Sequence, residues 1–426
     1  MRVLVLGAGG FIGSAVTARL LARGDEVVGV ARRVGVAHPA LRWVRLDIAR
    51  ARSAADWRPH LDGIDAVVNC AGVLEGAADA TRGVHVDGIA ALAEACEQAG
   101  IRRFVHLSAV GADREALSPF SETKKAGEAA LSARDLDWVI LRPSVVVGRA
   151  AYGGSALLRG LAALPVLPEI PDAGPLQVVQ LDDLVATILF FVEPGAPARV
   201  ALDVAGPERL SFDDVVLTYR RWLRLEPPRR LRVPRWLFAL GYKLGDVIGA
   251  LGWRTPIRTT ARRELVRGAV GDPSRWIEMT GIEPRSLDDA LAAEPASVQE
   301  RWFARLYFVK PIVFAIFAAF WILTGLVSLG PGWDVGLEYM VRGGAGAVAV
   351  PGVIAGALAD IVIGIGIAIR RTAKPALYAA LAISVFYLIT GTILLPELWA
   401  DPIGPMMKIW PIIALNLAAL AIVEDR

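Results

Sequence analysis

The sequence predicts an α/β protein in which a doubly wound parallel sheet precedes a four-helix transmembrane bundle. Short apolar runs alternate with helical stretches through residues 1–150. A spaced set of glycines follows the first run, and four long apolar runs occupy the chain after residue 305. Alternating strands and helices form βαβ units with a parallel sheet, and a helix of about 20 apolar residues crosses the hydrocarbon core of a bilayer.

Six apolar runs near the N-terminus have the length and composition of strands. They are residues 2–6, 26–31, 41–45, 64–69, 103–108 and 136–142. Helical spacing of apolar residues lies between them, most clearly in 11–24, 88–100 and 121–134. Right-handed crossovers would place these helices on both faces of the sheet.

Composition divides the chain into three parts. Residues 1–228 hold the sheet domain, and their last part, from about 151, is rich in Pro and Gly and is expected to form a small substrate lobe. Residues 229–304 are a basic linker region with several Trp. Within them, 233–253 has an apolar face, which fits a helix on a membrane surface or one packed on the domain's own core. Residues 305–426 form the membrane domain.

The membrane domain holds four runs long enough, or nearly so, to span a bilayer: 311–330, 346–369, 376–395 and 406–423. Asp360 lies in the second run. Because a charge is costly in lipid, we expect it to face a partner or a cavity, with a structural, proton-transfer or quinone-binding role. Gly352 and Gly356 form a small-xxx-small pattern that would let two helices approach closely.

Loop charge predicts the orientation of the membrane domain. Residues 370–374, "RRTAK", join the second and third runs and are strongly basic. Basic loops stay on the cytoplasmic side. The sequence therefore predicts a multi-pass protein of a bacterial inner membrane, with both termini and the N-terminal domain in the cytoplasm.

Bulk composition favours a membrane protein and argues against a nucleic-acid partner. Hydrophobic residues make up 54% of the chain, and the formal net charge is only +3, with no long basic run. Cys70 and Cys96 lack the spacing of a zinc site, so we expect no metal and two buried, reduced thiols.

The glycines after the first run predict a dinucleotide-binding, Rossmann-type domain. Gly7 permits a tight turn, Gly10 lets the backbone approach a pyrophosphate, and Gly13 lets the helix pack close to the sheet. The helix N-terminus then offers free N–H groups to the phosphates. The residues expected to bind the cofactor here are Gly7, Gly9, Gly10, Phe11, Ile12 and Gly13.

The end of the second strand favours NADP(H) over NAD(H). Sites for NAD usually carry an acid there, for the ribose 2′-OH. This chain has Arg32 and Arg33, which suit a 2′-phosphate, although solvated arginines at a strand end are the alternative. Asp47 is expected near the adenine, and "NCAGV" (69–73) brings Ala71 and Gly72 to the cofactor.

These residues together resemble the extended and atypical short-chain dehydrogenase/reductase superfamily over about residues 1–220. Ser108, Lys124 and "LRPSVVVG", which contains Pro143, follow the glycines in the expected order. The resemblance is to the branch with sugar-epimerase-like proteins and the Rossmann accessory subunit of respiratory complex I. The tail is similar to the DoxX-like family, through "DPIGPMMK" (401–408).

The resemblance implies a proton-transfer site that this chain carries in part. Ser108 takes the place of the serine that steadies the substrate oxygen, and Lys124 that of the lysine that holds the nicotinamide ribose and lowers a tyrosine pKa. The tyrosine position, one helical turn before Lys124, is Phe120. Tyr152 is a candidate replacement acid, with a half-buried loop aromatic as the alternative.

Two histidines lie near these positions in the sequence. His85 stands where the family often has asparagine, and an imidazole can titrate near neutral pH. His106 is expected to be a core or interface residue.

Two functions follow from these observations. The first is a membrane-anchored NADP(H)-dependent oxidoreductase acting on a quinone, an isoprenoid or a lipid. The second is a non-catalytic NADP(H)-binding module, structural or sensory, in a membrane complex. Phe120 favours the second function, whereas Ser108 and Lys124 favour the first.

Overall fold

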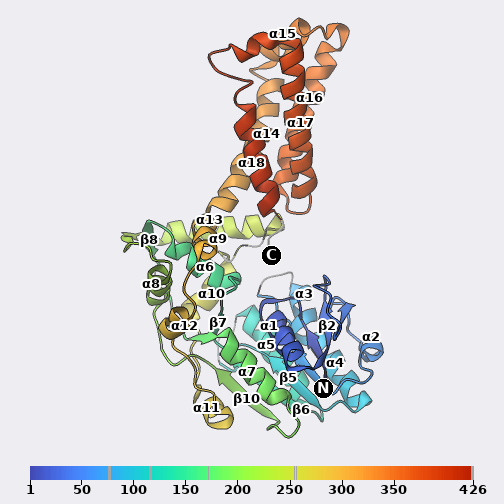
Figure 1. Ribbon diagram of the computed structural model, residues 1–426, viewed down its shortest axis with the longest axis vertical. Helices are drawn as coiled ribbons and strands as arrows, with labels where there is room; N and C mark the ends of the chain where they lie inside the picture. Colours follow the sequence, from blue (N-terminus) through green and yellow to red (C-terminus); the bar gives the residue numbers. More distant parts are fainter. Residues whose placement is uncertain (75–77, 115–117, 171, 254, 256, 424–426) are drawn as a thin grey trace. The chain divides into compact units, whose positions relative to one another are not determined.

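The computed structural model describes residues 1–426 except 75–77, 115–117, 171, 254, 256 and 424–426. The chain divides into two compact units (Figure 1). The first comprises Met1–Tyr242 and Pro256–Ala304, and the second comprises Lys243–Thr255 and Arg305–Arg426.

The first unit is built on a seven-stranded sheet in which every neighbouring pair is parallel, in the order β10-β6-β5-β4-β1-β2-β3. The strands are β1 (Arg2–Leu6), β2 (Glu26–Ala31), β3 (Leu41–Arg45), β4 (Ala66–Asn69), β5 (Arg103–Leu107), β6 (Asp137–Pro143) and β10 (Val200–Val204). The predicted doubly wound sheet is confirmed. Strand order reverses between β1 and β4, and in such sheets ligands bind in the crevice at that point.

Alternate residues of β1 enter two separate cores, one on each face of the sheet. Val3 and Val5 join a core that includes residues of α1 (Phe11–Arg23) and α7 (Leu181–Val192). Leu4 and Leu6 join a second core with residues of α4 (Gly88–Ala99) and α5 (Pro119–Ser132). Helices therefore cover both faces (Figure 1), as right-handed βαβ crossovers require. Further elements on this part are α2 (Ala54–Trp57), η1 (Arg58–His60), α3 (Ala78–Arg82) and η2 (Gly83–Asp87).

The rest of the first unit forms a lobe around two small sheets. One pairs β7 (Val145–Val147) with β9 (Val178–Gln180), and the other pairs β8 (Val166–Glu169) with β11 (Arg229–Arg232). Its helices are α6 (Gly153–Ala162), α8 (Phe212–Trp222), α10 (Thr259–Arg267), α11 (Ser274–Thr280) and α12 (Leu287–Ala293). Trp276 of α11 is fully buried, and its indole N–H donates to Thr187 Oγ1 of α7 at 2.9 Å, which ties residues beyond 256 to the sheet domain.

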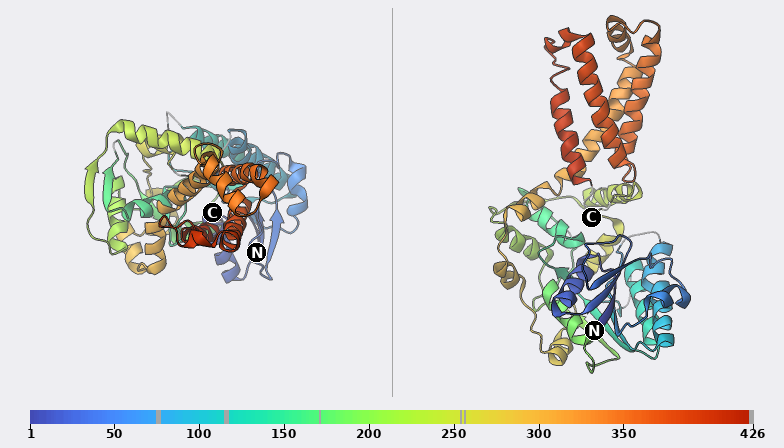
Figure 2. Two further views of the ribbon diagram at one scale, coloured as in Figure 1. Left: turned by 90° about the horizontal axis from the view of Figure 1, so that it is seen from above. Right: turned by 45° about the vertical axis from the view of Figure 1, so that its right-hand side comes forward.

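Among the described residues, the second unit has three helices long and apolar enough to cross a membrane: α14 (Val309–Leu329), α16 (Ala349–Ala368) and α17 (Ala373–Leu394). They run side by side with the shorter α18 (Ile409–Ile422) (Figure 2, orange to red). The fourth predicted run is helical for only 14 residues, a rise of roughly 21 Å. The remaining elements are α13 (Val298–Leu306), α15 (Trp333–Arg342), η3 (Gly346–Val348) and η4 (Pro396–Trp399). Residues 333–342, between the first two predicted apolar runs, form α15.

Close packing in the membrane unit uses different glycines from those predicted. A Cβ on Gly325 would lie 2.4 Å from the carbonyl oxygen of Ala357, and one on Gly364 would lie 2.7 Å from that of Ala318, so α14 and α16 touch backbone to backbone. Gly352 and Gly356 face side chains, Met340 and Tyr387 respectively. Asp360 is buried in α16, and its Oδ1 has no hydrogen-bond partner among the described residues.

Candidate functional site

The glycine loop between β1 and α1 has the shape that a bound diphosphate needs. Gly7 has φ +70°, and the Gly10 N–H donates to its carbonyl at 2.8 Å. A Cβ on Gly13 would lie 2.2 Å from the same carbonyl oxygen, so only glycine fits there without movement. The N-cap of α1 is Gly10, and the first turn carries no acidic side chain. The N–H groups of this helix end, and its positive dipole, are therefore suited to an anion, and the residues present fit a dinucleotide.

Two arginines follow the strand beside that loop. Arg32 and Arg33 come directly after β2 and are exposed. A Cβ on Gly9 would lie 3.8 Å from the Arg33 carbonyl oxygen, so the arginine pair lies next to the phosphate loop. Asp47 follows β3, accepts a hydrogen bond from the Ala49 N–H at 3.3 Å, and keeps a carboxylate that is 42% exposed. Its open face leaves room for a ligand contact.

A buried hydrogen-bonded pair, Asn69 and His106, fixes the end of β4. Asn69 Nδ2 donates to His106 Nδ1 at 2.8 Å, and Asn69 Oδ1 accepts from the Ala71 N–H at 3.0 Å. Burial lowers the pKa of His106 well below its usual value, helped by the charge of Lys124. His106 is thus the core histidine that was expected. Ala71 lies against Gly7, where a Cβ would come within 3.1 Å of the Ala71 backbone.

Lys124 is buried beside the same loop. Its Nζ donates to the Leu107 carbonyl oxygen at 2.9 Å and lies 3.3 Å from where a Cβ on Gly72 would be. Burial lowers the pKa of Lys124 to about 8, and the charge of Glu128 opposes the shift only in part. Glu128 is itself held by Arg142 of β6 through contacts of 2.6 and 3.0 Å. An ammonium near neutral pH is therefore fixed at the end of β5.

His85 is a structural residue, not a titrating one. The Val73 N–H donates to its Nε2 at 3.0 Å, so the hydrogen of the neutral ring sits on Nδ1 and is donated to Thr123 Oγ1 at 2.8 Å. Thr123 in turn donates to the Phe120 carbonyl oxygen at 2.8 Å. Burial, with the charge of Lys124, lowers the pKa of His85 to about 3. The expectation that it titrates near neutral pH was wrong, because both ring nitrogens are used and water is excluded.

Two serine hydroxyls without hydrogen-bond partners among the described residues lie at the ends of β5 and β6. Ser108 and Ser144 are both buried, and neither Oγ has a hydrogen-bond partner among the described residues. The Ser108 N–H donates to the Leu141 carbonyl oxygen at 2.8 Å, which fixes it to the neighbouring strand. Pro143 ends β6 directly before Ser144 and is buried. A buried hydroxyl without a partner costs stability, so both are candidates to bond a ligand oxygen.

Tyr152 lies at the phosphate end of the site. Its ring is 45% exposed and stacks on Phe11 at the start of α1, with centroids 5.9 Å apart and planes 8° apart. It precedes α6, whose Arg159 is almost fully buried and donates to the carbonyl oxygens of Arg149 at 2.8 Å and Gly148 at 2.6 Å. The Arg159 guanidinium therefore anchors the loop that carries Tyr152 by two hydrogen bonds to its backbone.

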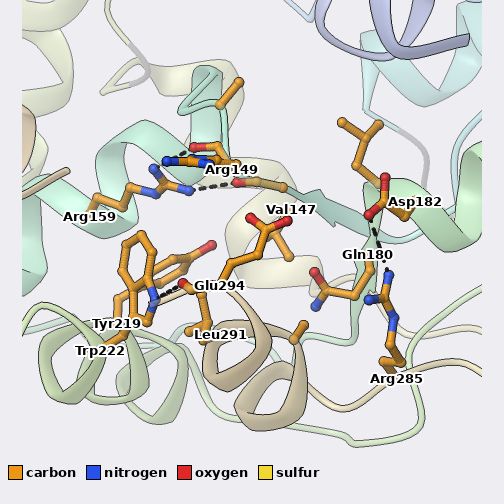
Figure 3. A pocket seen from close by; sticks show the side chains of 14 residues that line it. Val147, Arg149, Arg159, Gln180, Asp182, Tyr219, Trp222, Arg285, Leu291 and Glu294 are labelled. Carbon is orange, nitrogen blue, oxygen red and sulfur yellow. Dashed lines mark hydrogen bonds and ion pairs between the residues drawn. The ribbon is translucent and has the colours of Figure 1, made fainter. Parts of the chain in front are cut away.

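The same guanidinium lines a cavity of about 160 Å³ in the lobe (Figure 3). Arg159 lies over the rings of Tyr219 and Trp222 of α8, 5.5 and 5.1 Å from their centroids. Gln180 and Leu291 also line it (Figure 3). The residues lining this cavity do not include Ser108, Phe120 or Lys124, so it is separate from the predicted proton-transfer site.

The structure thus brings the predicted serine and lysine to the end of one strand, β5, and leaves Tyr152 with Phe11. Sequence reasoning missed Ser144 and the link from His85 to Thr123. "LRPS" contained the signal for Ser144, since a hydroxyl directly after a buried strand is a ligand candidate in a parallel sheet. The link had no local signal, because its two residues are 38 positions apart. Both cysteines are free thiols, with Cys96 buried and Cys70 half-buried.

Comparison with known proteins agrees with both units. Residues 7–159 match the NAD(P)H-binding family, and residues 318–417 match the DoxX-like family. A ceramide reductase of Caulobacter vibrioides is 28% identical over 237 residues, covering 54% of this chain and 73% of that protein. Sterol demethylase protein B of Methylococcus capsulatus is 28% identical over 332 residues, covering 71% and 99%. The predicted resemblance to NAD(P)-binding short-chain dehydrogenase/reductase proteins with a DoxX-like tail is confirmed.

Other matches are more partial. An uncharacterized protein of Mycobacterium bovis is 32% identical over 217 residues, half of this chain but only 22% of that protein's length. Among solved structures, the enzyme WbmG of Bordetella bronchiseptica in complex with NAD superposes with a TM-score of 0.54 and 18% identity, over 72% of this chain and 96% of that one. Likeness at that identity concerns the fold alone, which the first unit shares with that enzyme.

Proposed function

We propose that this chain, in which an NAD(P)H-binding domain precedes a DoxX-like domain, is a membrane-anchored NADP(H)-dependent oxidoreductase that acts on a hydrophobic substrate from the bilayer. The observation that carries the proposal is the position of Lys124 and of two unpartnered hydroxyls, Ser108 and Ser144, at the carboxyl ends of the neighbouring strands β5 and β6, among the residues that the structure describes. A bound reduced nicotinamide would supply a hydride. The chain must then supply orientation and a proton.

The residues of the chain divide this work. Gly7, Gly10 and Gly13, with the N-terminus of α1, would hold the diphosphate, and Ala71 and Gly72 would line the cofactor. Ser108 Oγ would donate a hydrogen bond to the substrate oxygen and hold it in place. Lys124 would hold the ribose and keep a proton on Nζ. With a pKa of about 8, that ammonium is the group best matched to proton transfer near neutral pH.

Because Phe120 stands at the predicted tyrosine position, another residue must donate the proton. A phenyl ring has no acidic hydrogen, and the Thr123 hydroxyl is already committed to the Phe120 carbonyl oxygen. Tyr152 supplies a phenol, but its ring stacks on Phe11 at the phosphate end. We therefore favour Lys124 over Tyr152 as donor, with Tyr152 as a wall of the site.

Arg32 and Arg33 support NADP(H) as the cofactor. Both are exposed beside the phosphate loop, where a guanidinium pairs well with a 2′-phosphate.

The membrane unit and the relatives support a lipid-like substrate. Two matched proteins are named for ceramide and sterol chemistry, and three helices in the part of the chain that the structure describes are long and apolar enough to span a bilayer. A substrate that partitions into lipid would reach a membrane-anchored domain without leaving the membrane surface. The basic loop at 370–374 favours the cytoplasmic side of an inner membrane for the first unit.

The second candidate function is a non-catalytic NADP(H)-binding module of a membrane complex. Phe120 favours it, because its ring packs edge-on against the neutral His85, with centroids 5.6 Å apart. The Phe120 ring therefore makes an edge-on aromatic contact with His85 at the position where active relatives would need a phenol.

Steady-state oxidation of NADPH decides between the two functions. Full-length protein in nanodiscs would be given NADPH with a keto-sphingolipid, a 3-keto sterol, an isoprenoid aldehyde or a quinone, and absorbance followed. The proposal predicts turnover with at least one acceptor, abolished in Gly13→Val and retained in Gly154→Ala, since Gly154 faces open space. Tight NADPH binding with no turnover on any acceptor would favour the non-catalytic module.

A further inference from the structure

A stripe of large apolar side chains lies exposed along α9 (Arg235–Ala250) and the residue after it. The stripe consists of Trp236, Leu237, Leu240, Leu244, Val247, Ile248 and Leu251, exposed by 39% to 65%. At about 100° per residue, these seven positions fall within an arc of about 120°. Such a narrow, continuous face is what an amphipathic helix presents to an apolar phase.

The rest of α9 is already occupied by protein contacts. Gly245 is buried, and Phe238, Tyr242 and Gly249 on the same side are half-buried. The stripe is therefore the apolar part of the α9 surface that contacts with the rest of the protein leave exposed. The alternative that this helix packs its apolar face on the domain's own core was wrong, because Gly245 is its one buried residue.

The turn after α9 is fastened to the end of a membrane-spanning helix. The indole N–H of Trp253 donates to the carbonyl oxygen of Ala368, the last residue of α16, at 2.7 Å. The Arg370 N–H donates to the Leu251 carbonyl oxygen at 3.0 Å, and its guanidinium lies 5.4 Å from the Trp253 ring centroid. The last exposed residue of the stripe is thus bonded to the connection between α16 and α17, where the apolar span gives way to the basic loop 370–374.

Charge around the stripe matches an anionic surface. Residues 229–267 contain ten Lys or Arg and two Asp or Glu. Lys243 is exposed at the edge of the stripe. Anionic headgroups attract juxtamembrane basic segments, and lysine and arginine stems can lie along lipid while their charges stay in water.

We propose that α9 lies in the plane of the membrane, with its stripe buried at the headgroup–acyl boundary of the leaflet that faces loop 370–374. The occupant of the stripe is anionic lipid. This inference does not depend on the oxidoreductase activity, because it rests on the exposed face of α9, its bonded turn and the surrounding charge.

Nitroxide accessibility in the full-length protein tests the proposal. Spin labels would be placed by Leu244→Cys and Val247→Cys in a Cys70→Ala, Cys96→Ala background, with the protein in nanodiscs of phosphatidylcholine and phosphatidylglycerol. Ile316→Cys, on an exposed position of α14, is the lipid reference, and Asp62→Cys, on an exposed loop of the sheet domain, is the aqueous reference. Both stripe labels should collide with oxygen more than with a water-soluble nickel chelate, as the Ile316 label does.

Two outcomes would overturn the proposal. Stripe labels that behave like the Asp62 label would show that the face is in water. Labels screened from both oxygen and nickel would show that a second copy or another protein covers it. A Lys243→Glu variant supplies the electrostatic control: it should reduce oxygen collisions of the stripe labels in mixed vesicles and have little effect in phosphatidylcholine alone.

Discussion

The ring of Phe120 packs edge-on against the imidazole of His85, with centroids 5.6 Å apart and planes at 78°. The phenyl group stands at the position where the resemblance predicts an acidic phenol. Its neighbour is a neutral imidazole whose two nitrogens are both engaged. The helix that carries Lys124 is thereby fixed, and the usual proton donor is missing.

Phe120→Tyr should raise the rate of NADPH oxidation without changing NADPH affinity. The new hydroxyl would lie one helical turn from Lys124, whose positive charge lowers a phenol pKa. General acid catalysis typically contributes about 10²–10⁴-fold, so we expect an increase of at least about tenfold in kcat. The measurement is kcat on the best lipid acceptor, with Phe120→Leu as the size control. An unchanged kcat in a variant that binds NADPH normally would favour the non-catalytic module.

His85 should make the protein sensitive to acid. Its pKa is about 3 in the folded protein, against an ordinary value of 6.5, so the unfolded chain binds the proton first as pH falls. Stability is unaffected above about pH 6.5 and declines as pH drops from there towards 3. The loss is about 3 kcal/mol at pH 4 by linkage.

Thermal unfolding of the detergent-solubilised protein across pH 4 to 7 checks this. His85→Gln should flatten the acid limb, whereas His38→Gln, at an exposed position, should leave it unchanged. Identical pH profiles for wild type and His85→Gln would show that the imidazole is not held neutral.

The elements that the sequence predicted well are those whose signals are local. The six strands of residues 1–142 read as apolar runs, and Gly7, Gly10 and Gly13 lie within one turn that seven residues define. β10 was missed because "VALDV" has no clear strand pattern of its own and is a strand through its pairing with β6, some 60 residues earlier. α15 was missed because its polar residues resembled a loop. Its apolar residues Val335 and Val341 are exposed on the helix and do not mark a buried face.

The proton-transfer site shows the same division. Ser108 and Lys124 follow a recognisable order along the chain, whereas the setting of Lys124 depends on packing that no local pattern encodes. A Cβ on Gly127 would lie 2.1 Å from the His85 carbonyl oxygen, so α5 lies directly on the π-helical turn η2. That contact buries His85 and makes it structural. An ordinary pKa was the natural expectation for the imidazole from sequence, since burial is a property of the assembled fold.

Arg32→Ala should weaken NADPH binding more than NADH binding. One lost charged hydrogen bond to a 2′-phosphate is worth roughly 1.5–3 kcal/mol, or about tenfold or more in Kd. Fluorescence titration of the full-length protein with each nucleotide measures the ratio. Arg50→Ala, an exposed arginine beside Asp47, is the matched control and should leave the ratio unchanged. Equal losses for NADPH and NADH in Arg32→Ala would argue against a 2′-phosphate site.

Arg159→Met should loosen the loop that carries Tyr152. The substitution removes two hydrogen bonds to the carbonyl oxygens of Gly148 and Arg149 and the contact of the guanidinium with the Tyr219 ring, while keeping a long apolar side chain at this buried position. We expect KM for NADPH to rise by about tenfold, since a hydrogen bond to a charged group contributes roughly 1.5–3 kcal/mol, with kcat little changed. Hydrogen exchange of residues 148–152 should increase in parallel. A KM equal to that of wild type would mean that the loop holds its place without this anchor.

Lys124 should impose a fall in rate above about pH 8. Its ammonium is buried with a pKa of about 8, so the protonated form that holds the ribose and donates the proton is lost as pH rises through that value. We expect kcat to drop about tenfold for each pH unit beyond it. Lys124→Arg keeps the charge and cannot titrate in this range, so its rate should be low and flat with pH. Lys125→Arg, at the exposed neighbouring position, should retain the wild-type profile. A wild-type rate that stays level to pH 10 would place the proton donor elsewhere and return Tyr152 to consideration.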